Sequence, residues 1–163
     1  MNEGAVAEDE GQLGGFLPYQ LSVASNAVSS LIAERYRKRF GLKIPEWRVM
    51  AVLGDAGTMT QRNLTAATVM DKVAVNRAVK VLEERGLIAR VPNPGDGRSH
   101  LLALTGEGRA IHAEVMPLAK ATEQELIAGL APGEEAMLRG LLAGLRQRAM
   151  ELARRNDAGP EQG

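Results

Sequence analysis

Apolar residues recur at every third or fourth position over residues 17–40 of the chain. This spacing places them on one face of an α-helix. Pro18 suits the first turn of such a helix, because the first backbone amides have no partner within the helix. A run of cations precedes Gly41, and cations interact favourably with the dipole at a helix C-terminus. The pattern therefore predicts one long amphipathic helix, Leu17–Phe40.

Two short helices follow in the pattern. Pro45 begins the first, which we expect to reach about Asp55, where Ala56 and Gly57 stop it. The second covers residues 61–68, with Thr60 in the place of an N-cap. Its free amides would meet a phosphate near Gln61 and Arg62.

Residues 71–86, DKVAVNRAVKVLEERG, have two different faces at helical period. Val75, Val79 and Leu82 fall on one side. The other side is basic and carries an amide, through Lys72, Val73, Asn76, Arg77 and Lys80. A tight link at residues 69–72 joins this helix to the preceding one, so the pair predicts a helix-turn-helix.

Residues 87–104 contain two short apolar runs separated by a cluster of Pro, Asn, Gly and Asp. Such a cluster forces a turn, so we expect a β-hairpin with Arg98 near its tip. Thr105 then caps a long helix that ends at about Gly129 and that Pro117 should kink. The last helix starts at Pro132, and its leucines repeat with a period of about 3.5, close to a coiled-coil seam. A partner chain explains this seam best, so we infer a homodimer.

Length and composition narrow the class of protein. With 163 residues and 45% hydrophobic content, the chain favours a single domain with one core. It has no cysteine, which excludes disulfides and thiolate metal sites. No apolar run approaches the roughly 18 residues of a membrane span, and the acidic N-terminus differs from a signal peptide, so we expect a cytoplasmic protein. Residues 1–15 predict a disordered acidic tail and residues 157–163 a frayed end.

Charge is unevenly distributed although the formal net charge is zero. Acids concentrate in the N-terminal tail and the last third of the chain. Between residues 57 and 100 cations outnumber acids: the cations are Arg62, Lys72, Arg77, Lys80, Arg85, Arg90 and Arg98, against Asp71, Glu83, Glu84 and Asp96. A locally basic region of this kind is typical of a protein that binds nucleic acid through one face.

Catalysis and metal binding find little support in the pattern. The two histidines are His100, on the second hairpin strand, and His112, on the following helix. His112 and Glu114 are two residues apart and do not share a helical face, so they are a poor metal pair. Gly95 and Gly97 fit a hairpin turn better than a phosphate-binding loop. We therefore expect no enzyme, no metal and no cofactor.

Three segments together resemble the MarR family of bacterial winged-helix regulators. They are PEWRVMAVL (45–53), LEERGLI (82–88) and RVPNPGDGRSHLLALTGEG (90–108). In that family the wing carries an Asp-x-Arg element, here Asp96-Gly97-Arg98. The similarity covers about residues 17–152. It implies a mainly α fold with a small β-hairpin wing (α+β), in which a winged helix-turn-helix reader, 45–104, lies between dimerisation helices, 16–44 and 105–156, of one domain, 16–156.

The resemblance implies a homodimeric, sequence-specific transcriptional regulator that binds a palindromic double-stranded DNA operator, most simply as a repressor. Residues 71–84 would enter the major groove, where Asn pairs with adenine and Arg or Lys with guanine, and Arg98 would enter the minor groove. Asp96 would hold Arg98 through a charge-assisted bond. The expected DNA-binding residues are Thr60, Gln61, Arg62, Lys72, Val73, Asn76, Arg77, Lys80, Asp96, Arg98 and Ser99.

Three positions depart from the family's common pattern. Family members often have Thr at the position of Asn76, an acidic residue at that of Lys80 and Arg at that of Val81. These differences lie on or beside the basic face, so we expect this chain to bind a different operator sequence.

Many members of the family respond to small aromatic or phenolic effectors. The candidate pocket lies between the first and second helices, with Ser25, Asn26, Ser29, Trp47 and Met50 as its wall. Ordinary helix packing is the alternative for these residues. Two other functions stay open: a winged-helix module that binds an acidic protein without specific DNA binding, and the dimerisation segment of an enzyme. Steep salt dependence of binding to duplex DNA separates the regulator from the protein-binding module.

Overall fold

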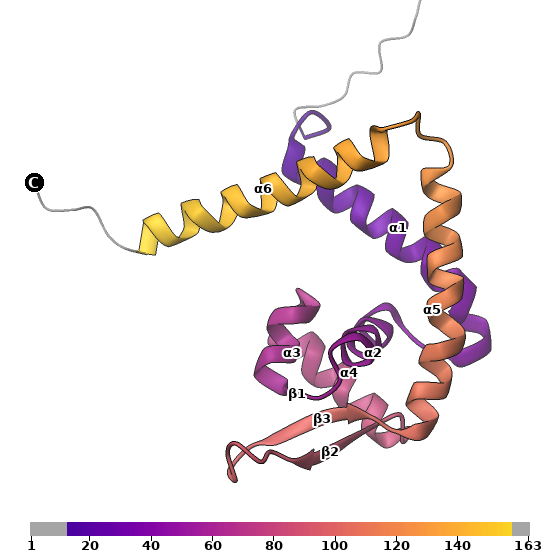
Figure 1. Cartoon of the computed structure of the whole chain (residues 1–163), viewed down its shortest axis with the longest axis vertical. Helices are drawn as coiled ribbons and strands as arrows, with labels where there is room; N and C mark the ends of the chain where they lie inside the picture. Colours follow the sequence, from indigo (N-terminus) through magenta and orange to yellow (C-terminus); the bar gives the residue numbers. More distant parts are fainter. Residues whose placement is uncertain (1–12, 158–163) are drawn as a thin grey trace, which may run out of the picture. The chain divides into compact units, whose positions relative to one another are not determined.

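The computed structural model describes residues 13–157 of the chain. Most of the expected N-terminal tail, residues 1–12, and the expected frayed end from residue 158 onward lie outside the described residues. The chain divides into two compact units, Met1–Thr122 and Glu123–Gly163. The elements in order are α1 (Leu17–Phe40), α2 (Ile44–Ala56), β1 (Met59–Thr60), α3 (Gln61–Thr68), α4 (Lys72–Glu84), β2 (Ile88–Pro92), β3 (His100–Leu104), α5 (Gly106–Ile127) and α6 (Glu134–Asp157) (Figure 1). The mainly helical fold with a small sheet is confirmed.

Helix α2 is the centre of the first unit, where α3, α4 and β3 pack against it. Its side chains Val49, Met50 and Leu53 are almost completely buried. Leu64 of α3 and Leu102 of β3 add two more fully buried side chains to the same core. The reader is therefore built around a hydrophobic core that also takes in Ala33 and Tyr36 of α1, and the outward faces of α3 and α4 stay available for binding.

Local sequence signals fix where the helices begin and end. The Thr60 hydroxyl accepts a hydrogen bond from the Asn63 amide at 3.2 Å, so the predicted N-cap of α3 is confirmed. The Asp71 carboxylate caps α4 in the same way, accepting from the Ala74 amide at 2.8 Å. Gly41 ends α1 in a left-handed conformation at φ 63°, which glycine adopts without steric cost.

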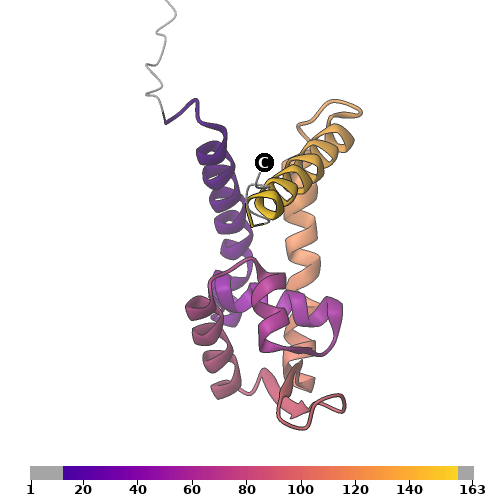
Figure 2. The same ribbon diagram turned by 90° about the vertical axis from the view of Figure 1, so that its left-hand side faces the viewer.

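The predicted hairpin is present, and a short third strand completes the sheet. The order is β1-β3-β2, with both pairs antiparallel. In the hairpin, Ile88 lies opposite Leu104 and Pro92 opposite His100. Met59 of β1 pairs with Leu102, an interaction that the sequence did not suggest. Figures 1 and 2 both show the hairpin loop extending beyond the helices of the reader.

Thr105 joins the sheet to α5 and confirms the predicted cap. Its hydroxyl oxygen accepts a hydrogen bond from the Gly108 amide at 3.0 Å and donates one to the Gly86 carbonyl at 2.7 Å. The second bond ties the start of α5 to the turn after α4. Helix α5 then continues through Pro117 as one element.

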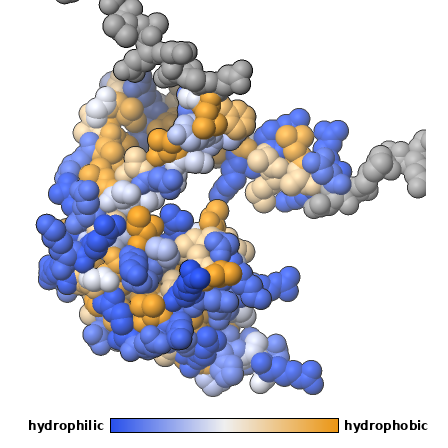
Figure 3. Space-filling model, turned by 180° about the vertical axis from the view of Figure 1, so that it is seen from behind, coloured by the Kyte–Doolittle hydropathy of each residue, from blue (hydrophilic) through white to orange (hydrophobic). Residues whose placement is uncertain are grey.

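Helix α6 leaves its apolar residues uncovered within its own unit. Leu138, Leu141, Leu142, Leu145 and Leu152 are between 41% and 66% exposed. Figure 3 shows hydrophobic residues on the surface of this helix, on the right. Arg139 bridges the α5 residue Glu123 at 2.7 Å and Glu135 at 2.9 Å. Within residues 13–157, no helix has the length and apolar content required to cross a membrane.

Candidate nucleic-acid interface

Helix α4 separates its apolar and basic residues as its sequence predicts. Val75, Val79 and Leu82 are at most 1% exposed and belong to the core. The opposite face is exposed and holds Lys72, Val73, Asn76, Arg77 and Lys80. This face combines four polar or charged side chains with one exposed valine, which is the chemistry needed to contact base edges and phosphates.

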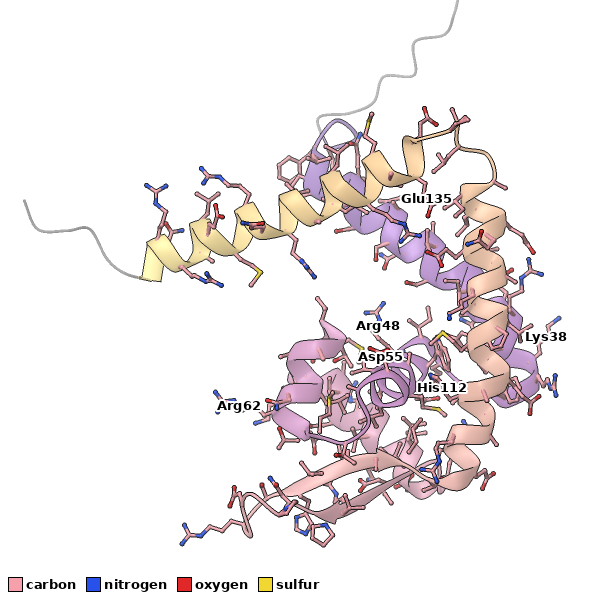
Figure 4. All side chains as sticks on the ribbon, in the orientation of Figure 1. Lys38, Arg48, Asp55, Arg62, His112 and Glu135 are labelled. Carbon is pink, nitrogen blue, oxygen red and sulfur yellow. The ribbon has the colours of Figure 1, made fainter. Side chains whose placement is uncertain are left out.

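The N-terminal part of α3 lies beside this face. Gln61, Arg62 and Thr65 of α3 and Lys72 and Asn76 of α4 line a surface hollow of about 530 Å³. Arg62 points from α3 into solvent (Figure 4). Thr60 holds the start of α3 through its capping bond. The structure thus brings the expected residues of α3 and α4 together on one surface.

A chain of polar contacts connects the two helices with the hairpin. Gln61 donates a hydrogen bond from Nε2 to Oδ1 of Asn76 at 2.5 Å. Arg90 of β2 donates to Oε1 of Gln61 at 3.4 Å. The same guanidinium forms two contacts with the Glu83 carboxylate, from Nε at 2.7 Å and from Nη2 at 3.2 Å. Arg90 and Glu83 could be recognised in the sequence only as contributors to local charge, because no spacing rule links residues of three different elements.

The tip of the hairpin is organised by its own side chains. Asn93 accepts from the Gly95 amide at 3.0 Å and donates to the Ser99 hydroxyl at 2.7 Å. The Asp96 carboxylate accepts from the backbone amide of Arg98 at 3.0 Å. Asp96 therefore does bond to Arg98, through the backbone amide of that residue, which fixes the turn while the Arg98 side chain stays exposed.

Arg85 has a structural role within the basic region. Its guanidinium donates to the carbonyls of Phe40 at 2.6 Å and Gly41 at 3.2 Å, which end α1. These carbonyls are among the groups that a helix C-terminus leaves without a partner, so Arg85 satisfies them. The guanidinium is committed to this contact, and we leave Arg85 out of the candidate interface.

The turn between α3 and α4 contains a strained valine. Val69 adopts φ 54° and ψ 40°, the left-handed conformation that β-branched residues avoid. Its side chain is 86% exposed. Glycine or asparagine is the usual residue in this conformation, so a valine does not mark the turn in the sequence.

A small pocket lies between α1 and α2, and it includes two of the five residues expected there. Ser29 and Trp47 line a space of about 170 Å³ together with Ile32, Tyr36, Ile44, Arg48 and Ala51. Ser25 and Asn26 are exposed on α1 outside this lining, and Met50 is completely buried in the core. Burial raises the pKa of Tyr36 to about 12, so its phenol is neutral at ordinary pH.

His112 of α5 packs against the same aromatic group. Its ring stacks on Trp47, with centroids 5.6 Å apart and planes at 29°. Figure 4 shows His112 directed from α5 toward α2. Its Nε2 is buried and has no hydrogen-bond partner among the described residues. Within residues 13–157, no group of three His, Asp or Glu side chains is arranged to hold a metal ion.

The chain is similar in sequence to proteins of one known family. The sequence model of the MarR family matches residues 40–99. The transcriptional regulator HosA of Escherichia coli O111:H- is 32% identical over 94 residues, which cover 58% of this chain and 69% of HosA.

Two solved structures extend the match over most of the chain. The MarR family transcriptional regulator SPO1453 of Silicibacter pomeroyi DSS-3 is 31% identical, with a TM-score of 0.73 over 84% of this chain and 97% of that one. BpsR of Bordetella bronchiseptica, whose DNA binding is regulated by 6-hydroxynicotinic acid, is 26% identical, with a TM-score of 0.71 over 81% of this chain and 94% of that one. These relatives are regulators rather than enzymes, and the chain belongs to the MarR family of transcriptional regulators.

Proposed function

We propose that this protein is a homodimeric repressor that binds a palindromic DNA operator through α4 and the wing. The observation that carries the proposal is the exposed basic face of α4. Lys72, Arg77 and Lys80 lie on this face, opposite the buried valines, and Asn76 lies among them. An α-helix with this face fits the major groove, where side chains reach the base edges.

Cations on and around the basic face of α4 supply affinity that does not depend on the DNA sequence. Arg62 of α3 and the cations of α4 would neutralise phosphates, which releases counterions and makes binding sensitive to salt. Arg98, exposed at the wing, would reach the adjacent minor groove, whose negative potential attracts arginine. Thr60, Val73, Asp96 and Ser99 complete the proposed interface, with Asp96 acting on the turn backbone.

Helix α6 supports the homodimer. Its exposed leucines would remain in water in a monomer, at a cost of roughly 25 cal/mol for each Å² of apolar surface left uncovered. A second copy of the helix offers the same stripe, so a two-fold interface is self-complementary. Two readers held in this way match the two halves of a palindromic operator.

The α1–α2 pocket is our proposed effector site. Its volume of about 170 Å³ suits one aromatic ring, since an apolar cavity of about 150 Å³ accepts benzene in another protein. Trp47 and Tyr36 supply aromatic walls, and Arg48 could pair with a carboxylate. The regulation of BpsR by 6-hydroxynicotinic acid supports an aromatic acid as the effector. Binding of such an effector to this protein would favour a spacing of the two readers that does not fit the operator.

Selection of bound sequences from random duplexes tests the DNA-binding part. We expect an enriched palindrome, binding as two chains per duplex in sedimentation analysis, and affinity that falls steeply with salt. Weak binding without sequence preference and without salt dependence would contradict the proposal and favour a protein-binding module. Placing the enriched palindrome across a promoter in a transcription assay tests repression, because a bound repressor lowers transcript yield and an activator raises it.

Calorimetry with a panel of aromatic acids tests the effector site. We expect binding that the substitution Trp47→Ala removes and that releases the enriched duplex from the wild type. The matched control is Ser25→Ala, on the same helix as Ser29 but outside the pocket lining. Equal binding to the wild type and to Trp47→Ala would argue against this pocket.

A further inference from the structure

We propose that a polar relay from Glu83 through Arg90 and Gln61 fixes the side chain of Asn76 as a hydrogen-bond donor, so that this protein reads a guanine with Asn76. The inference rests on the proposed DNA-binding function and concerns which base is recognised. The general preference of asparagine is for adenine. The relay reverses that preference because it determines which end of the Asn76 amide is free.

The direction of the relay follows from its charged end. A carboxylate can only accept hydrogen bonds and a guanidinium can only donate them. Arg90 therefore donates to Glu83, through two contacts at 2.7 and 3.2 Å. The Glu83 side chain is 29% exposed and that of Arg90 44% exposed, so solvent screens the pair only in part.

The orientation of Gln61 comes next. Arg90 has only donors, so the atom of Gln61 that lies 3.4 Å from its Nη2 must be the carbonyl oxygen Oε1. The amide nitrogen Nε2 then lies on the other side, 2.5 Å from Asn76. That nitrogen can only donate, and the atom of Asn76 that receives it must be Oδ1. The orientations of both amides are thus set by the chemistry of their neighbours.

The free end of Asn76 is consequently Nδ2, which carries two hydrogens. This nitrogen forms no hydrogen bond with any of the described residues, and the side chain is exposed on the basic face of α4. In the major groove guanine presents two neighbouring acceptors, N7 and O6. Adenine would need Oδ1 to accept from its N6 amino group on the one lone pair that Gln61 leaves, whereas guanine needs only the hydrogens of Nδ2, which have no other partner among the described residues. Guanine therefore matches Asn76 better than adenine does.

Gln61 is in this view a positioning residue that need not touch a base. Replacing it by the isosteric glutamate should reverse the direction of the hydrogen bond between residue 61 and Asn76. The new carboxylate would accept from Arg90 on one side and from Nδ2 of Asn76 on the other. Asn76 would then present Oδ1 together with one remaining Nδ2 hydrogen, which is the arrangement that pairs with N6 and N7 of adenine.

The test compares sequences selected from random duplexes by four full-length proteins. The variant Asn76→Ala identifies the operator position that depends on Asn76, as the position where base preference is lost. We expect guanine at that position for the wild type and adenine for Gln61→Glu. The control is Thr65→Glu, which adds the same charge to the same hollow at a residue that has no hydrogen bond with Asn76 and no place in the relay. It should bind more weakly and keep guanine.

A second measurement uses the wild-type operator with 7-deazaguanine at the same position, which removes only the N7 acceptor. We expect wild-type binding to weaken by about fivefold, the effect of one hydrogen bond, and Asn76→Ala to be unaffected. Adenine in the wild-type selection, guanine retained by Gln61→Glu, a shift to adenine in Thr65→Glu, or no position that depends on Asn76 would each overturn the relay. If the wild type enriches no sequence, the proposed DNA binding fails first, and the relay with it.

Discussion

The imidazole of His112 lies so close to Gly54 that no β-carbon fits between α5 and α2 at this point. A β-carbon placed on Gly54 would overlap three atoms of the ring. The ring is also stacked on Trp47, so it cannot move aside freely. We expect Gly54→Ala to lower the free energy of unfolding by about 1–3 kcal/mol, the usual cost of overpacking, in urea denaturation.

Two further variants control for this effect. Gly140 of α6 has open space where a β-carbon would lie, so Gly140→Ala should raise stability by roughly 0.5–1 kcal/mol through helix propensity alone. Adding His112→Ala to Gly54→Ala should remove the collision, so the two substitutions should be strongly coupled in a double-mutant cycle. If Gly54→Ala were as stable as the wild type, the close contact would be refuted.

Stability should also depend on pH through His112. Burial lowers the pKa of His112 from its ordinary value of 6.5, and Asp55 opposes this shift without cancelling it. The unfolded chain keeps the ordinary value, so it binds the proton first as pH falls. The free energy of unfolding should therefore decrease as pH drops through 6.5, until it passes the lower pKa of the folded state.

Chemical denaturation at pH 7.5 and 5.5 measures this dependence. His112→Gln, which cannot titrate, should lose less stability between the two conditions than the wild type. The exposed His100 gives the matched control, and His100→Gln should behave as the wild type does. The same loss in His112→Gln as in the wild type would show that other groups cause the pH effect.

The left-handed Val69 should be a source of strain that a substitution can remove. Asparagine tolerates this conformation better than a β-branched residue, so Val69→Asn should raise the free energy of unfolding by about 0.5–1 kcal/mol. Val73 is also an exposed valine, but it lies in an ordinary helix, where valine and asparagine have similar propensities. Val73→Asn should thus leave stability nearly unchanged, and thermal unfolding of both variants measures the difference. Equal effects of the two substitutions would mean that the backbone at Val69 stores no strain.

Arg98 should contribute to operator affinity from the wing. Removing its charge by Arg98→Ala should weaken binding by about 1–3 kcal/mol if the arginine enters the minor groove, and should lower the slope of affinity against salt by about one. Fluorescence anisotropy over a salt series measures both quantities. Lys120, an exposed cation of α5, provides the control, since Lys120→Ala removes the same charge outside the reader. Equal weakening by both substitutions would indicate a general charge effect and no specific wing contact.

Periodicity predicted most of the fold because long elements repeat their pattern several times. The boundaries of α1 and α3 agree with expectation, and the cluster of turn residues located the hairpin. Strand β1 has only two residues, too few to show any alternation, so its pairing with Leu102 could not be seen. The turn at Val69 was also poorly marked, since its conformation is imposed by the flanking helices and not by the residue itself.

Side-chain contacts were harder to predict from the sequence than the fold. The basic face of α4 could be read from spacing along one helix, and its residues are indeed exposed together. Arg98 could be predicted as the partner of Asp96, but the donor group could not, because the choice between a backbone amide and a guanidinium depends on turn geometry. The contact between Gln61 and Asn76, and that of Arg90 with both Gln61 and Glu83, join residues from three elements whose proximity exists only after folding.

The contact between Gln61 and Asn76 has a consequence for how relatives of this protein could diverge. Glutamine and glutamate codons differ by one nucleotide, so a single point mutation could replace the operator preference without altering any residue that touches a base. Such a change would leave the phosphate contacts and the folded core in place, and the altered protein would still bind DNA. Duplicated copies of the gene could thereby acquire separate sets of target promoters in one mutational step.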